Sequence, residues 1–165
     1  MKIQTSLLLL LVFVVIKASA NSPQITAVTI ENTEKFTDFK MIYRYTKRDN
    51  DRLIADLTNQ IQRAINRILP VGLSMQINIT NVDMAGVVSP TFEARKIRSN
   101  LDVSLLEFDY SLVNIDNKII KSDHVILEDK FLNHKSLELN RFSHSYFKYE
   151  LVMFSRWLKK LSKTL

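Results

Sequence analysis

Apolar and polar residues alternate along residues 73–80, where every second side chain is apolar. This two-residue period is typical of a strand with one buried face. Residues 106–112 repeat it, and residues 101–105 have the opposite parity, which indicates a bulge or bend at Leu105-Leu106. Asp116-Asn117 supplies turn chemistry, so we expect residues 118–127 to return as the next strand of an antiparallel hairpin.

Apolar residues spaced by three and four predict two amphipathic helices. The first begins at Asp49 or Asn50, either of which can cap it, and ends at Pro70-Val71-Gly72, because proline cannot continue a helix and glycine permits the turn. Its apolar stripe consists of Leu53, Leu57, Ile61, Ala64, Ile65 and Ile68. The second helix lies at the end of the chain. Its apolar stripe consists of Leu151, Phe154, Leu158 and Leu161, with Trp157 beside them.

The remaining segments complete a predicted order of β-α-β-β-β-α. Residues 25–31 are rich in β-branched side chains and suit a first strand. Residues 81–100 and 128–143 have no sustained period, so we interpret them as irregular connections. The sequence therefore predicts an α+β fold, in which an antiparallel sheet of about four or five strands packs with the two amphipathic helices.

The first twenty residues have the three parts of a secretory signal peptide. Lys2 gives a positive start, residues 7–16 are an unbroken apolar run, and Ala18-Ser19-Ala20 offers small residues to signal peptidase. As a helix this run rises only about 15 Å, half of a bilayer's hydrocarbon core. We therefore expect residues 1–20 to be cleaved off, leaving one globular domain over residues 21–165 with no transmembrane anchor.

The amino-acid composition excludes several kinds of chemistry for this chain. Apolar residues make up 46% and charged residues 24%, as in globular proteins. The chain has no cysteine, which excludes disulfides, thiol nucleophiles and thiolate metal sites. The formal charge is +6, and +4 once Lys2 and Lys17 leave with the signal. This mild excess favours anionic partners such as lipid head groups or polysaccharide, while export argues against nucleic acid.

Five short motifs follow one another along the chain: Phe36-Thr37-Asp38, Leu69-Pro70-Val71-Gly72, Val82-Asp83-Met84-Ala85-Gly86, Leu127-Glu128-Asp129-Lys130-Phe131, and Lys148-Tyr149-Glu150 before Trp157. In this order they resemble the bacterial family called domain of unknown function 3016. The resemblance spans nearly the whole mature chain. It implies an exported bacterial protein, periplasmic in a Gram-negative cell, and it implies no activity and no site.

Catalytic candidates are few. The chain has only two glycines, too few for a phosphate-binding loop, a dinucleotide fingerprint or a nucleophile elbow. We therefore expect no cofactor. No paired-histidine zinc motif occurs, and we expect no metal. Asp83 lies in an Asp-Met-Ala-Gly element that also suits a plain turn. The dispersed side chains that would serve a hydrolase, if the fold brought them together, are Asp83, Asp123, His124 and Asp129.

The last helix offers a second alternative. Lys159, Lys160 and Lys163 beside its apolar stripe are compatible with docking on an anionic membrane surface. The same pattern describes a helix packed on a sheet, which we favour because a small domain needs that stripe to cover its sheet.

With export indicated and no catalytic set apparent, the sequence favours a non-catalytic periplasmic protein, or one secreted to the medium. Its sheet or its long connection would bind another envelope protein or an envelope component. A hydrolase and a peripheral membrane protein are the alternatives.

Overall fold

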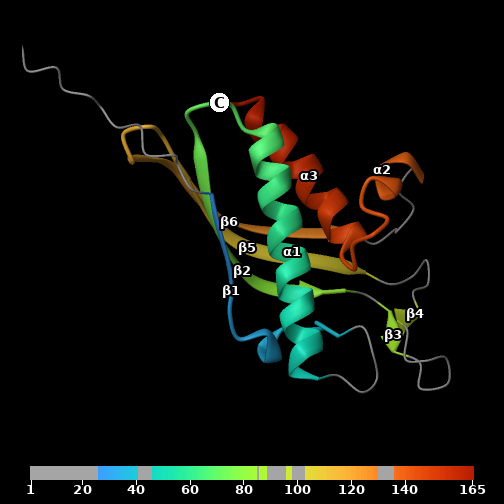
Figure 1. The fold of residues 1–165 in the computed structure, drawn as a ribbon. Coiled ribbons are helices and arrows are strands. Elements are labelled where there is room, and N and C mark those ends of the chain that lie inside the picture. Colours follow the sequence, from blue (N-terminus) through green and yellow to red (C-terminus); the bar gives the residue numbers. More distant parts are fainter. Residues whose placement is uncertain (1–25, 41–45, 85, 89–95, 98–102, 130–135) are drawn as a thin grey trace, which may run out of the picture.

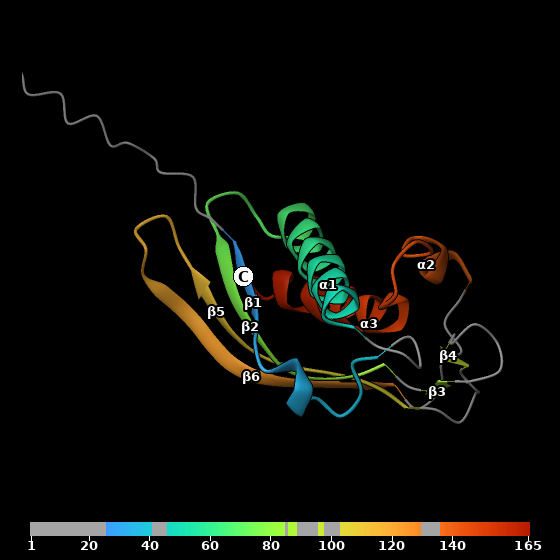
Figure 2. The same cartoon turned by 60° about the horizontal axis from the view of Figure 1, so that its bottom comes forward.

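The computed structural model describes residues 26–40, 46–84, 86–88, 96–97, 103–129 and 136–165. Two long helices lie on one face of a curved four-stranded sheet (Figure 1; Figure 2). The predicted α+β class is confirmed. The elements, in chain order, are β1 (Ala27–Ile30), the short 3-10 helix η1 (Thr33–Lys35), α1 (Lys47–Ile68), β2 (Ser74–Asp83), β3 (Val87–Val88), β4 (Lys96–Ile97), β5 (Ser104–Val113), β6 (Ile119–Asp129), α2 (Ser136–Asn140) and α3 (Lys148–Ser162).

The sheet has the strand order β1-β2-β5-β6. Strand β5 is antiparallel to both β2 and β6, as predicted. Strand β1 is instead parallel to β2, because α1 crosses between them and returns the chain in its original direction. Strands β3 and β4 form a separate antiparallel pair within the segment that the sequence suggested was irregular.

Strand β2 is longer than its alternation predicts. The pairing with β5 shifts between Ile79 and Asn81, so one extra residue, Thr80, changes the parity and the strand continues to Asp83. Val82 consequently joins the core. The bend expected at Leu105-Leu106 is wrong: the register of β5 is continuous there and shifts near Val113 instead.

Helix α1 begins earlier than predicted, because Thr46 caps it. The Thr46 hydroxyl accepts a hydrogen bond from the backbone N–H of Asp49 at 3.3 Å, and the Asp49 carboxylate accepts one from the backbone N–H of Thr46 at 3.0 Å. This reciprocal pair is a capping box. The Thr46 hydroxyl also donates a hydrogen bond to the Asp49 carboxylate, and this bond is the main cause that lowers the pKa of Asp49. The helix ends before Pro70 as predicted, and Gly72 takes a φ of +88° in the turn that follows.

The core lies between the helices and the sheet. The predicted stripe of α1 is buried except for Ile68, which is partly buried, and that of α3 is buried throughout. Trp157 of α3 stacks edge-on against Phe108 and Tyr110 of β5, with ring centroids 4.9 and 5.1 Å apart. The apolar stripe of α3 therefore covers the sheet, which is the use that the sequence favoured over membrane docking.

Candidate functional site

Figure 2 shows that one side of the sheet faces away from α1 and α3. The pairing of the strands places polar residues in register on that side. We call this side the open face. Cα pairing places one residue from each strand in a single row, because directly paired residues share a face. That row is Thr29, Asn78, Asp109 and His124, all of them exposed. Polar residues of distant segments are thus assembled into one surface.

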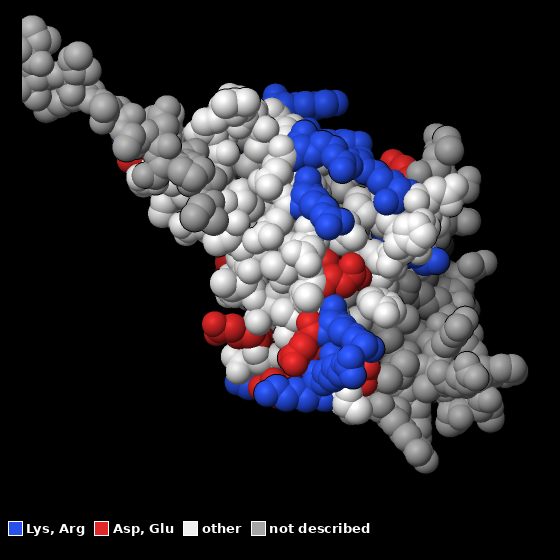
Figure 3. Space-filling view, viewed as in Figure 1, with Lys and Arg blue, Asp and Glu red and all other residues white. Residues whose placement is uncertain are grey.

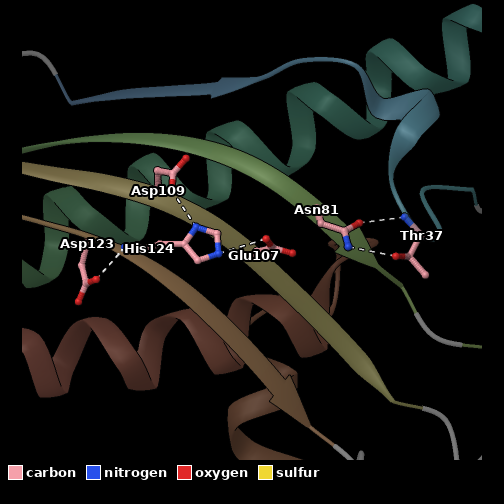
Figure 4. Close-up of polar contacts among 6 residues, drawn as sticks. All are labelled: Thr37, Asn81, Glu107, Asp109, Asp123 and His124. Carbon is pink, nitrogen blue, oxygen red and sulfur yellow. Dashed lines mark hydrogen bonds and ion pairs between the residues drawn. The ribbon is translucent and has the colours of Figure 1, made fainter.

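His124 lies on the open face between two carboxylates (Figure 4). Its Nδ1 is 2.8 Å from Oδ1 of Asp109, and its Nε2 is 3.1 Å from Oε1 of Glu107. The hydrogen bond with Asp109 is the main cause that raises the pKa of His124, and the two negative charges add to it. A carboxylate beside each ring nitrogen favours the doubly protonated imidazolium, which donates to both.

The carboxylates of Asp109 and Glu107 hold the ring of His124 in place. A general base needs a ring nitrogen with a lone pair directed at the substrate, and here each nitrogen of His124 already faces a carboxylate oxygen. Beside the row is a hollow of about 270 Å³. It is lined by Ala27, Thr29, Gln76, Ile77, Asn78, Asp109, Tyr110 and Ser111. The surface therefore offers hydrogen-bonding groups and negative charge around a shallow depression.

The structure does not bring the four sequence candidates together. His124 pairs with Asp109, whereas Asp129 pairs with Ser104, five residues further along β5 and roughly 17 Å away at strand spacing. Asp83 pairs with Leu105, four residues from Asp109 on the same strand. Only Asp123 and His124 are neighbours, and they belong to opposite faces of β6.

Asp123 lies on the helix side of β6. It is paired with Tyr110, and its carboxylate accepts a hydrogen bond from the backbone N–H of His124 at 2.9 Å (Figure 4). Burial raises the pKa of Tyr110, and the nearby negative charge of Asp123 adds to the effect. Asp123 thus acts on the tyrosine beside it and not on the imidazole ring.

Sequence reasoning missed Glu107 and Asp109, the two partners of His124. Their alternation with Phe108 and Tyr110 was a usable signal, because it places both carboxylates on the side of β5 away from the core. What could not be seen was the register that sets them opposite His124. In the described ranges, no three His, Cys, Asp or Glu side chains are arranged to hold a metal ion.

One residue of the motif Lys148-Tyr149-Glu150 is fully buried. Glu150 lies in the first turn of α3, where the positive end of the helix dipole favours a carboxylate. The hydroxyl of Ser104 donates a hydrogen bond to it and thereby joins the start of α3 to the start of β5. The motif is therefore used to fasten α3 to the sheet.

In the part of the chain that the structure describes, the geometry defines an α+β protein with one polar sheet face that neither long helix covers. The family model of DUF3016, proteins of unknown function, matches residues 25–160, so the chain belongs to that family, as its motifs predicted. No curated protein matches it. Among solved structures it is similar to a "putative lipoprotein" from Caulobacter crescentus CB15, with 10% identity over 68% of this chain and 82% of that one.

The TM-score of this match is 0.38, and a likeness at that level carries no inference about function. Separately, none of the helices in the described residues combines the length and the apolar character needed to cross a bilayer.

Proposed function

We propose that this chain is an exported, non-catalytic binding protein, and that its open sheet face binds a partner protein through a segment rich in lysine and arginine. The observation that carries the proposal is the row across all four strands, with His124 fixed between Asp109 and Glu107. A surface of this kind presents fixed charges and hydrogen-bonding groups to a ligand.

Charge supports the choice of partner. The register places Glu107, Asp109 and Glu128 on the open face, and the paired residues of that face in the described strands include no lysine or arginine. The chain as a whole is basic, with a formal charge of +6, or +4 without Lys2 and Lys17 of the signal. The open face is thus an acidic surface on a basic protein, and such a surface steers a cationic partner toward it.

The edge of the sheet supplies an apolar contact within the same surface. Ile126 of β6 is 56% exposed and is paired with Glu107 across the strands. Protein interfaces commonly join apolar side chains at their centre with charged groups around them. Ile126 and the neighbouring carboxylates have that composition.

The contacts of both His124 ring nitrogens and the raised pKa of the ring support a binding role over a catalytic one. Both of its nitrogens face carboxylates, and the raised pKa keeps the ring protonated to higher pH than an unperturbed histidine. While it is protonated, the ring anchors Asp109 and Glu107 in fixed positions. A partner then meets a surface whose polar groups are already ordered, which reduces the entropy lost on binding.

Export rests on residues 1–20, which we propose are cleaved off as the protein is exported to the periplasm. Cell fractionation and sequencing of the mature N-terminus test this part. Recovery of the processed chain with Asn21 first, in the periplasmic fraction, is the expected result. A chain retained in the cytoplasm with Met1 intact contradicts it.

Binding is tested by placing a photo-crosslinking residue at Gln76 or Ser122, both exposed on the open face, and at the exposed Asn66 of α1 as a control. The expected result is one partner captured from the two open-face positions and not from Asn66. Equal capture from all three positions, or capture from Asn66 alone, refutes the assignment to this face.

Once identified, the partner is purified and its affinity is measured for Glu128→Lys and for the matched control Asp51→Lys. Glu128 belongs to the open face, whereas Asp51 is an exposed residue of α1. Reversing Glu128 is expected to weaken binding by about tenfold, which corresponds to about 1.4 kcal/mol, and Asp51→Lys by less than about twofold. Equal losses in the two variants point to long-range charge alone and remove the proposed surface.

A further inference from the structure

A second hollow lies on the helical side of the molecule and has the opposite charge. Its volume is about 270 Å³, and it lies between α1 and the chain that joins α2 to α3. It is lined by Gln60, Arg63, Ala64, Arg67, Arg141, Phe142 and His144. We call it the arginine pocket. Figure 3 shows lysine and arginine side chains gathered over the C-terminal half of α1 and toward α2.

Helical spacing explains one wall of the pocket. Gln60, Arg63 and Arg67 are three and four residues apart on α1, so they lie above one another on one side of the helix. Ala64, on the same side, is buried and leaves room between the long side chains. Ala64 borders the apolar stripe of α1, which packs into the core through Leu57, Ile61 and Ile65 and so fixes the direction of the wall.

The opposite wall is held by its own contacts. Arg141 lies over the ring of the buried Phe142, with its guanidinium carbon 5.7 Å from the ring centroid. The next part of this loop is tied to α1 by Asp56, whose carboxylate accepts hydrogen bonds from the Ser145 hydroxyl at 2.7 Å and from the backbone N–H of Tyr146 at 3.0 Å. Both walls are therefore positioned before any ligand arrives.

Within the described residues, no carboxylate neutralises the charge of the pocket. Three guanidinium groups line it, and no carboxylate does. Across the described ranges, the arginine ion pairs are Arg52 with Asp49 and Arg156 with Glu138, so none of them involves Arg63, Arg67 or Arg141. Three like charges held in one hollow repel one another, and an anion bound between them relieves that repulsion.

We propose that the arginine pocket binds a phosphate-bearing ligand. Guanidinium groups match the oxygens of a phosphate with paired N–H donors, and arginine stays charged at any physiological pH. A water molecule takes up about 30 Å³, so the pocket has room for a phosphate group and part of the molecule that carries it. Ala64 and Phe142 offer apolar contact for that remainder.

Binding is measured on the protein purified after export, with amide NMR shifts followed as inorganic phosphate and then pyrophosphate are added at constant ionic strength. The double variant Arg63→Gln with Arg67→Gln removes two charges from one wall, and Arg141→Gln removes one from the other. Lys159→Gln with Lys160→Gln is the matched control, because both lysines are exposed on α3 and do not line the pocket. Thermal unfolding checks that each variant is folded.

The expected result is a saturable shift at residues 60–67 and 141–144, with affinity reduced by about tenfold or more in both arginine variants and by less than about twofold in the lysine control. No saturable shift up to about 10 mM pyrophosphate, together with no pocket-dependent vesicle binding, overturns the proposal. An equal loss in the lysine control also overturns it, because general attraction to a basic surface then explains the binding.

A second arm separates a lipid head group from a soluble phosphate compound. The same variants are sedimented with vesicles of phosphatidylglycerol in phosphatidylcholine, and with phosphatidylcholine alone. Association that the arginine variants lose and the lysine control keeps assigns the pocket to a head group. Pyrophosphate binding without vesicle association assigns the pocket to a soluble ligand. Vesicle association that is lost in the lysine control and kept in the arginine variants contradicts a role of the pocket at the membrane.

Discussion

Replacement of Asp56 by alanine tests how the loop between α2 and α3 is held to α1. The carboxylate of Asp56 accepts one hydrogen bond from the hydroxyl of Ser145 and one from the backbone N–H of Tyr146. The Ser145 hydroxyl in turn accepts a hydrogen bond from the backbone N–H of Phe147 at 3.1 Å, just before α3 begins. Asp56→Ala removes the acceptor on which this chain of contacts depends.

The two hydrogen bonds differ in value because their surroundings differ. Tyr146 is exposed, so water replaces the lost acceptor at its N–H, at a cost of about 0.5–1 kcal/mol. Ser145 is buried, and losing a charged acceptor there costs about 1.5–3 kcal/mol. The free energy of unfolding should therefore fall by about 2–4 kcal/mol, which for a domain of this size lowers the Tm by roughly 10 °C.

Urea unfolding followed by the fluorescence of Trp157, the single tryptophan of the chain, measures this change. Asp56→Asn keeps one oxygen acceptor and should lose about half as much. Asp51→Ala, an exposed acidic residue on the same helix, is the matched control and should change stability by about 0.5 kcal/mol or less. If Asp56→Ala and Asp51→Ala agree within that margin, Asp56 does not hold the loop.

Three further changes have expected results. The pKa of His124 is raised in the folded protein, so the protonated ring stabilises the fold at pH below the unfolded pKa of about 6.5, and this stabilisation is lost as the pH rises through the folded pKa. His124→Gln should therefore lower the free energy of unfolding more at about pH 5.5 than at about pH 9. Equal losses at the two pH values contradict the ion pairs. Phe108→Ala should cost about 3–5 kcal/mol in urea unfolding, because the ring is fully buried against Trp157, and a cost below about 1 kcal/mol would be inconsistent with that packing. Thr46→Ala should cost about 1 kcal/mol while Thr46→Asp keeps the cap, as urea midpoints will show; an unchanged Thr46→Ala midpoint argues against the capping box.

The membership in DUF3016 and the α+β class were both predictable from the sequence, and so were the faces that α1 and α3 bury. These properties depend on residue spacing within a single segment, because a period of 3.6 or 2 residues places side chains on one side of a helix or strand whatever surrounds it. The end of α1 before Pro70 was also predicted correctly, because proline itself cannot continue a helix. The predictions failed where a longer-range contact altered a local pattern, as at Thr80, whose bulge carries β2 on to Asp83.

The candidate sites were decided by pairing between distant segments. His124 meets Asp109 across a sequence separation of 15, Thr29 contacts Asn78 across 49, and Asp56 holds Ser145 across 89. In each case the sequence showed the polar side chain but not its partner, because strand register and helix packing follow from burying the whole apolar surface at once. The sequence by itself therefore determined the family, the two long helices, the main strands and their buried faces, but it missed β3, β4 and the short helix α2, which lie in segments predicted to be irregular. Only the tertiary structure decided which charges meet, on the open face and in the arginine pocket.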